Sequence, residues 1–141
     1  MKPETKGHLD RAAADLIRAP AAVGTMKEEP VTAEDVARNA YYAAFHAAKA
    51  LIFERSGITQ KRHGSVHKQF EDIAMAEPSL DPAFRTFLIR AYVFKRIGDY
   101  DIGAIGQIKP AYALLTLQEA ESFVAAIEGL MSDCLLDLDL V

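Results

Sequence analysis

The chain has 141 residues, enough for one ordinary domain and too few for two. Half of the residues are hydrophobic and 26% are charged, which excludes a disordered chain, and the single cysteine excludes a disulfide framework or a four-cysteine zinc site. The net charge of −4 does not indicate a dedicated nucleic-acid binder. No apolar run approaches the roughly 20 residues of a membrane helix, and no signal peptide is visible. We therefore expect a cytoplasmic protein.

Charge is distributed unevenly along the chain. All 16 Lys and Arg residues lie in residues 1–109, whereas residues 110–141 contain six acidic residues and no basic ones. An acidic tail over residues 132–141 can cover a binding surface or contact a partner. The alternative is a solvated helix end that aids solubility.

Apolar residues recur at helical spacing in five segments, which favours an all-α protein. The expected helices cover residues 8–19, 32–56, 65–76, 82–98 and 111–131. Five helices with short connections pack most simply as an up-and-down four-helix-type bundle with one additional helix. We expect a single domain with its core in residues 8–131.

Helix ends are marked by capping residues and by breakers. Pro20 is expected to end the first helix. Thr32 reads as the N-cap of the second helix and Gly57 as its C-cap. Asp81 followed by Pro82 begins the fourth.

The expected core faces combine large apolar residues with small ones. In the second helix, alanines at helical spacing allow another helix to approach closely. In the other helices the core-facing residues are Leu9, Ala12, Ala13, Leu16, Ile17, Val66, Phe70, Ile73, Phe84, Phe87, Leu88, Ala91, Phe94, Leu114, Leu115, Leu117, Ala120, Phe123, Val124 and Ile127.

The second helix carries a row of polar rings and cations. Arg38, Tyr42 and His46 are spaced four residues apart, so a helix places them on one narrow face, and Lys49 extends that face. A guanidinium, a phenol, an imidazole and an ammonium in a row can bind a phosphate and transfer a proton. The alternative is a polar seam, in which Tyr42 and His46 pack against a neighbouring helix.

A second basic group lies where a loop meets the third helix. Lys61, Arg62 and Lys68 surround His63 and His67, and a helix N-terminus favours an anion. The alternative is a solvated loop. Two histidines without carboxylate or cysteine partners do not make a metal site, and we expect neither a metal nor another cofactor.

A third group lies at the end of the fourth helix. Arg96 can pair with Asp99 or Tyr100 one turn later. This is either an ordinary ion pair at a helix end, worth less than about 1 kcal/mol, or an orienting pair at a phosphate site. The phosphate-binding loop, the dinucleotide-binding glycine pattern, the zinc-protease motif and the nucleophile elbow are all missing.

The segment Ala40–Leu51, AYYAAFHAAKAL, resembles the helix Ala-Tyr-Tyr-Ala-x-Phe-His-Ala-Ala-Lys-Ala-Leu of the HEPN superfamily, especially of its small stand-alone members. Weaker similarities follow in the same order: His63–Val66, Arg96–Tyr100 and Gln118–Val124. Together they cover roughly residues 35–130.

The resemblance implies a helical bundle, usually dimeric, that often acts beside a minimal nucleotidyltransferase as toxin and antitoxin. Many members are metal-independent ribonucleases with an Arg-x(4–6)-His motif. Arg96 occupies the place of that arginine, but no histidine follows it. Where the branch tends to have an arginine directly before Ala-Tyr-Tyr, this chain has Asn39, with Arg38 one place earlier.

Three hypotheses follow from these residues. As a ribonuclease toxin, the chain would use Arg96 to stabilise charge, His46 or His63 as acid–base group and Tyr100 as a phosphate contact. As a non-catalytic module, it would bind RNA, a nucleotide or a partner such as a nucleotidyltransferase antitoxin. The basic and aromatic residues would then serve binding alone: Arg38, Tyr42, Lys49, Arg62, His63 and Asp99. As a structural scaffold, it would use Arg38, Tyr42 and His46 as a polar seam. We expect a homodimer that joins its late helices, and no membrane contact.

Overall fold

The computed structural model describes residues 2–23, 30–59, 61–100 and 108–139, and within them the side chains of residues 17–23, 30–32, 97–100 and 132–139 are left out. The described residues form five helices and no strand. The helices are α1 (Pro3–Val23), α2 (Pro30–Ser56), α3 (His63–Met75), α4 (Pro82–Tyr100) and α5 (Pro110–Asp139). The all-α fold expected from the periodicity is confirmed.

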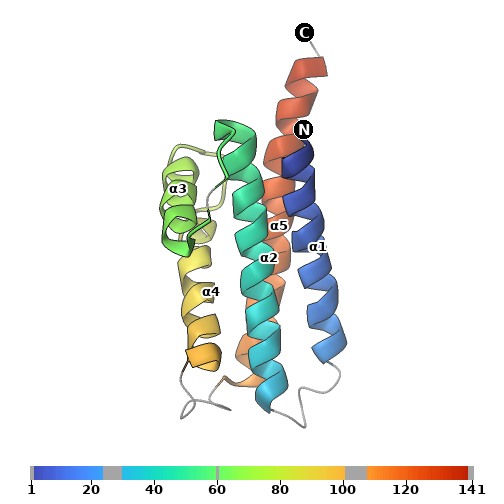
Figure 1. The fold of residues 1–141 in the computed structure, drawn as a ribbon, viewed down its shortest axis with the longest axis vertical. Coiled ribbons are helices and arrows are strands. Elements are labelled where there is room, and N and C mark those ends of the chain that lie inside the picture. The colour runs from blue at the N-terminus through green and yellow to red at the C-terminus, as the bar shows by residue number, and fades with distance from the viewer. Residues whose placement is uncertain (1, 24–29, 60, 101–107, 140–141) are drawn as a thin grey trace.

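The helices form an elongated bundle around α2 (Figure 1). Helix α2 packs against α1, α3, α4 and α5, and α3 packs beside α4. The chain leaves the bundle at the same end at which it enters, since α5 runs back past the start of α1 (Figure 1). This is the expected bundle of long helices with a shorter additional one, α3. None of the helices described here has the length and apolar character needed to cross a bilayer.

Alanine explains the central place of α2. Ten of its buried residues are fully inaccessible alanine, valine or leucine: Ala33, Val36, Ala37, Ala40, Ala43, Ala44, Ala47, Ala48, Ala50 and Leu51. Alanine has the highest helix propensity and the smallest side chain after glycine. A helix lined with it can therefore accept neighbours on several sides at short distance. The sequence pattern predicted one small-residue stripe, and the structure buries α2 on nearly its whole circumference.

Two capping predictions are confirmed. Gly57 has a φ of +73°, and its N–H donates to the carbonyl of Phe53, which ends α2 in the left-handed turn that favours glycine. The Asp81 carboxylate accepts a hydrogen bond of 2.9 Å from the N–H of Ala83, directly after Pro82 at the first position of α4.

Several predicted helix ends are wrong. Helix α1 begins at Pro3 and continues past Pro20 to Val23, α2 begins at Pro30 rather than at Thr32, and α5 continues to Asp139. Proline is well tolerated in the first turn because no intrahelical partner is needed for its missing N–H. Pro20 removes one backbone hydrogen bond from α1, but α1 lies along α2 and this packing is extensive.

The predicted core is mostly correct. Two residues are placed wrongly: Ala13 is exposed, and Leu115 is 59% exposed on α5. Leu9, Leu16, Ile73, Phe84, Phe94 and Leu114 pack against the core while partly buried, and the side chain of Ile17 lies outside the described residues. A periodic stripe of apolar residues identifies the side of a helix that faces the core. It does not identify which residues at the border of that stripe are buried, because the helix packs at an angle to its neighbours.

Candidate functional site

A polar pocket lies between α1 and α2. It has a volume of about 450 Å³ and is lined by Arg11 and Asp15 of α1 and by Arg38, Asn39, Tyr42 and His46 of α2. The i, i+4, i+8 spacing therefore places Arg38, Tyr42 and His46 at one cavity, as the sequence predicted. Two guanidinium groups at its wall favour an anionic ligand.

Arg38 and His46 of this pocket each have an acidic neighbour. Arg38 Nη1 lies 3.3 Å from Asp35 Oδ1 in a half-exposed ion pair. His46 Nε2 lies 3.8 Å from Asp15 Oδ2, and both of these side chains are almost fully buried. An exposed ion pair is worth at most about 1 kcal/mol, so a phosphate can compete for Arg38. The contact between Asp15 and His46 is an ion pair when the imidazole is protonated.

Beside the pocket, Tyr41 joins two histidines of α3. The Tyr41 hydroxyl lies 2.6 Å from His63 Nδ1 and 2.8 Å from His67 Nε2. Tyr41 is fully buried, while His63 and His67 lie one helical turn apart at the start of α3. A phenol has one proton, so it donates to one imidazole and accepts from the other.

Burial keeps these three groups uncharged. It raises the pKa of Tyr41, with a smaller contribution from Tyr92 and Tyr42. It lowers the pKa of His67 to about 4, with His63 as a second cause. The pKa of His63 is lowered first by burial and then by the ammonium groups of Lys95 and Lys49. Both imidazoles are thus neutral at pH 7.

Helix α4 completes this arrangement with two cations and a ring. The ring of Tyr92 stacks on His63 with centroids 5.4 Å apart. Lys95, only 4% exposed, places its Nζ 5.5 Å from the centroid of Tyr42 and 5.9 Å from that of Tyr92. The guanidinium of Arg96 lies 5.9 Å from the Tyr92 ring. These are cation–π distances.

The expected convergence of Arg96, His46 and His63 is therefore indirect. Phe45 links the two histidines, with its ring centroid 5.6 Å from that of His46 and 4.7 Å from that of His63. Tyr92 links His63 to Arg96. We call this group of residues the cationic–aromatic face. Its buried base is formed by Phe45, His46 and Lys95, and the residues that reach the surface are Arg11, Arg38, Tyr42, Lys49, His63, Tyr92 and Arg96.

The remaining predicted residues have different positions. Lys49 lies on this face with its Nζ 5.5 Å from the Phe45 ring centroid, and burial, then Arg11, lowers its pKa. Arg62 is exposed at the N-cap of α3, with no side-chain capping bond, while His67 bonds inward to Tyr41. The side chains of Asp99 and Tyr100 lie outside the described residues.

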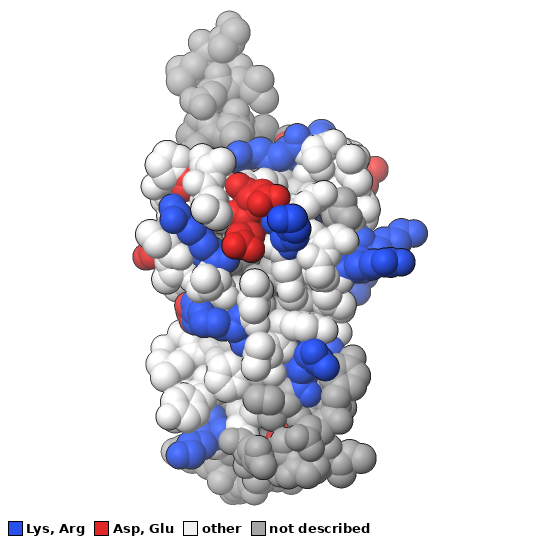
Figure 2. Space-filling model, turned by 90° about the vertical axis from the view of Figure 1, so that its left-hand side faces the viewer, with Lys and Arg blue, Asp and Glu red and all other residues white. Residues whose placement is uncertain are grey.

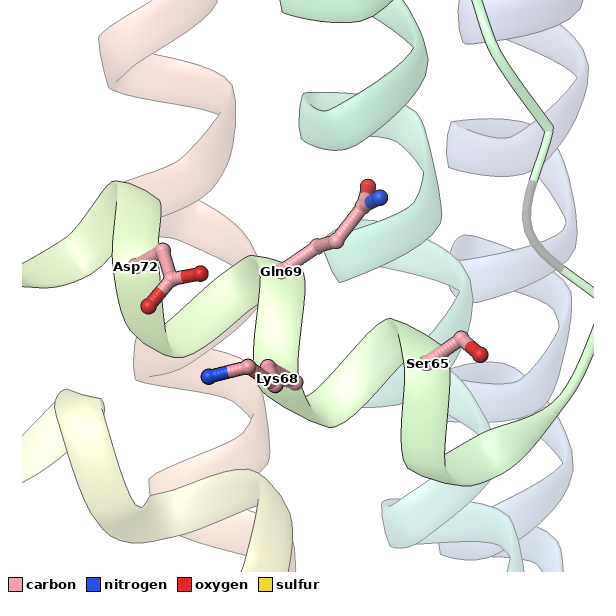
Figure 3. Close-up of a pocket in the computed structure, with 4 residues that line it drawn as sticks. All are labelled: Ser65, Lys68, Gln69 and Asp72. Carbon is pink, nitrogen blue, oxygen red and sulfur yellow. The ribbon is translucent and has the colours of Figure 1, made fainter.

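Elsewhere the surface is less organised. A shallow pocket of about 320 Å³ on α3 is lined by Ser65, Lys68, Gln69 and Asp72 (Figure 3). Over the outer side of α3 and α4, Lys and Arg side chains are spread separately and acidic side chains gather in one place (Figure 2). Charge on that side therefore does not mark a binding surface. Nowhere in the described part of the chain are three or more His, Cys, Asp or Glu placed to hold a metal ion.

Sequence reasoning missed Arg11, Asp15, Tyr41, Tyr92 and Lys95. Arg11 and Asp15 lie one turn apart on α1, a spacing that indicates a shared helix face. Tyr41 directly precedes Tyr42 and Lys95 directly precedes Arg96, two residues that were recognised. Their roles depend on contacts between helices, which no local pattern contains.

A scan against known protein families matches residues 6–137 to the HEPN domain. The match covers nearly the whole chain, and the protein therefore belongs to the HEPN domain family, in agreement with its helical bundle. A search of curated proteins finds no match.

Proposed function

We propose that this HEPN-domain protein binds RNA through the cationic–aromatic face and acts as the toxin-type component of a toxin–antitoxin pair. The observation that carries the proposal is the contiguity of cations and rings drawn from three helices, α1, α2 and α4, together with His63 of α3. Single-stranded RNA is bound by cations that contact phosphates and by rings on which bases stack. The face offers both within one surface.

The polar pocket supplies the first phosphate contact. Arg38 and Arg11 line it, and a guanidinium can bind a phosphate through two parallel hydrogen bonds. The partly buried ring of Tyr42 lies at the same pocket and beneath Lys95. A phosphate held by the arginines would thus have an aromatic surface beside it for the adjoining base.

A matched pair of arginines on α2 tests this binding. Arg38 and Arg55 each form an ion pair of 3.3 Å, with Asp35 and with Glu77, at opposite ends of the helix. We expect Arg38→Ala to weaken binding of a short single-stranded RNA on the order of tenfold, measured by fluorescence anisotropy, and Arg55→Ala to leave it unchanged. Equal affinities for the two variants would refute the proposed contact.

Beyond binding, the protein could also cleave RNA. Arg96 is exposed and beside Tyr92, where a guanidinium can stabilise charge that develops on a phosphate. No histidine follows Arg96 in the chain. This absence favours the alternative function, a non-catalytic module that binds RNA, a nucleotide or a nucleotidyltransferase partner through the same surface.

An assay on structured RNA separates the two functions. If the wild-type chain cleaves in the presence of a chelator and Arg96→Ala does not, the protein is a metal-independent ribonuclease. If both bind RNA and neither cleaves it, the binding module is correct. Equal cleavage by both would remove Arg96 from the mechanism.

We also propose that the protein is a homodimer joined through its late helices. Ile89 and Val93 are exposed one turn apart on α4, and Tyr112 and Leu115 are exposed one turn apart on α5. The ion pair of Arg90 with Glu119 joins these two helices at 2.7 Å. Exposed apolar residues on adjacent elements are typical of an interface.

A further inference from the structure

We propose that His63 contacts a phosphate of the bound RNA through Nε2 as an imidazolium ion, that Tyr41 positions its ring, and that RNA binding therefore takes up a proton. This inference rests on the proposed function. The proposed role of His63 in phosphate binding requires Tyr41 and His67, two residues that do not belong to the cationic–aromatic face.

The geometry leaves one nitrogen of His63 for a ligand. Nδ1 is held by the Tyr41 hydroxyl at 2.6 Å, and the ring is sandwiched by neighbours that include Phe45 at 4.7 Å and Tyr92 at 5.4 Å between centroids. Among the described residues, His63 Nε2 has no hydrogen-bond partner. The side chain of His63 is only partly buried. The ring is thus fixed in orientation with one polar atom available.

Two ammonium groups explain why a phosphate would change the charge of His63. Lys95 of α4 and Lys49 of α2 both repel a proton on this imidazole. The other titratable groups against it are Tyr41 and Tyr42 of α2, His67 of α3 and Tyr92 of α4. None of these is an acid that could stabilise the imidazolium ion in the free protein. A phosphate placed between these cations would supply the missing negative charge.

Tyr41 allows His63 to change charge without losing its hydrogen bond. When His63 is neutral, the phenol can donate its proton to Nδ1. When His63 is protonated, Nδ1–H donates to the phenol oxygen, and the phenol turns its own proton toward His67 Nε2, 2.8 Å away. His67 Nε2 accepts this proton in the tautomer that carries the His67 proton on Nδ1, so the change at His63 is accompanied by a change of tautomer at His67. His67 is therefore the acceptor that the imidazolium state of His63 requires.

Linkage gives the sign of the effect. If binding raises the pKa of His63, the complex holds more protons than the free protein. Affinity is then highest at low pH and falls as pH rises through the pKa of His63 in the complex, by up to about tenfold per pH unit for one proton.

Calorimetric titration of a short single-stranded RNA into the full chain tests the inference. Measurements at one pH in two buffers with different ionisation enthalpies give the number of protons taken up. We expect uptake approaching about one proton per RNA for the wild type near neutral pH, and none for His63→Gln, which should still bind RNA several-fold more weakly. His8 of α1 is the second imidazole to test, because its pKa is lowered by burial and then by Lys49 and Arg11 of the face. Uptake retained in His8→Gln would assign the proton to His63, whereas uptake lost in His8→Gln and retained in His63→Gln would assign it to His8.

Two further variants test the positioning role. Tyr41→Phe and His67→Gln should both reduce proton uptake while the exposed cations still bind RNA, and circular dichroism would confirm that each variant is folded. RNA binding with unchanged uptake in His63→Gln would overturn this inference and leave the proposed function standing. An absence of RNA binding by the wild-type chain would overturn both.

Discussion

The Tyr41 hydroxyl is a buried polar group with two imidazole partners. It is fully buried and lies within hydrogen-bond distance of His63 and His67. A buried hydroxyl without partners costs free energy, and so does a buried imidazole nitrogen. The hydroxyl and the two imidazoles thus provide one another with hydrogen-bond partners. Together they fix the start of α3 against the middle of α2.

Removal of this hydroxyl should destabilise the fold. Tyr41→Phe keeps the ring and leaves two imidazole nitrogens without their partner, so we expect the free energy of unfolding to fall by about 1–3 kcal/mol. Tyr42→Phe is the matched control, because no hydrogen bond of the Tyr42 hydroxyl is found among the described residues, and it should change stability little. Urea denaturation measures both. Equal loss in the two variants would contradict this role for Tyr41.

His67 should make stability depend on pH. Burial lowers its pKa in the folded state to about 4 from the ordinary value of 6.5, so the unfolded chain binds more protons between these values. The free energy of unfolding should therefore fall as pH is lowered from about 6.5 to about 4. The lowered pKa of His63 acts in the same direction.

The variant His67→Gln isolates this contribution. The pKa values of Glu54 and Glu77 are also lowered, by side-chain hydrogen bonds first of all, and they affect stability at the acid end in both proteins. We expect the variant to lose less stability than the wild type across this range, measured by urea denaturation at a series of pH values. Parallel curves would show that His67 is not the titrating group.

At the scale of the helices, the alanines of α2 set the distances within the bundle. Ala47 is fully inaccessible, and α2 has neighbours on several sides. Well-packed interiors have no room for added methyl groups without displacement of a neighbour. The close position of α2 between its neighbours thus depends on small side chains.

A larger side chain at Ala47 should force α2 and its neighbours apart. We expect Ala47→Leu to lower the free energy of unfolding by about 1–3 kcal/mol. Ala125→Leu on α5 is the control, since Ala125 is exposed, and it should be nearly neutral because both residues are good helix formers. If thermal denaturation gives the same midpoint for both variants, the close approach of helices at Ala47 is not what limits packing.

At the scale of the whole molecule, the two surfaces proposed above use different residues, although both include residues of α4. The cationic–aromatic face centres on α2, whereas the exposed apolar residues of the proposed dimer contact lie on α4 and α5. Binding and self-association should therefore respond to different substitutions.

Charged substitutions at the apolar residues test the dimer. We expect Val93→Glu combined with Leu115→Glu to convert the dimer into a monomer, measured by sedimentation equilibrium, because a buried carboxylate without a partner is costly at an interface. Ile58→Glu is the control, since Ile58 is also exposed and lies after the end of α2, on neither α4 nor α5. A wild-type chain that sediments as a monomer would exclude the proposed contact.

Local information was sufficient for the helical class, the five segments and several of their ends. Gly57 and Asp81 act within one turn of the backbone, so their sequence context determines their role. The face of Arg38, Tyr42 and His46 was predictable for the same reason, since four-residue spacing is a property of a single helix.

Other features required the packed bundle. Pro20 marks a helix end by local preference, yet α1 continues to Val23 along α2. The contacts of Tyr41 with His63 and His67 span 22 and 26 residues, and Lys95 reaches Tyr42 from another helix. Periodicity indicates which side of a helix is apolar, but it does not indicate which other helix packs against that side. The partners of each buried polar group are therefore decided only when the helices pack.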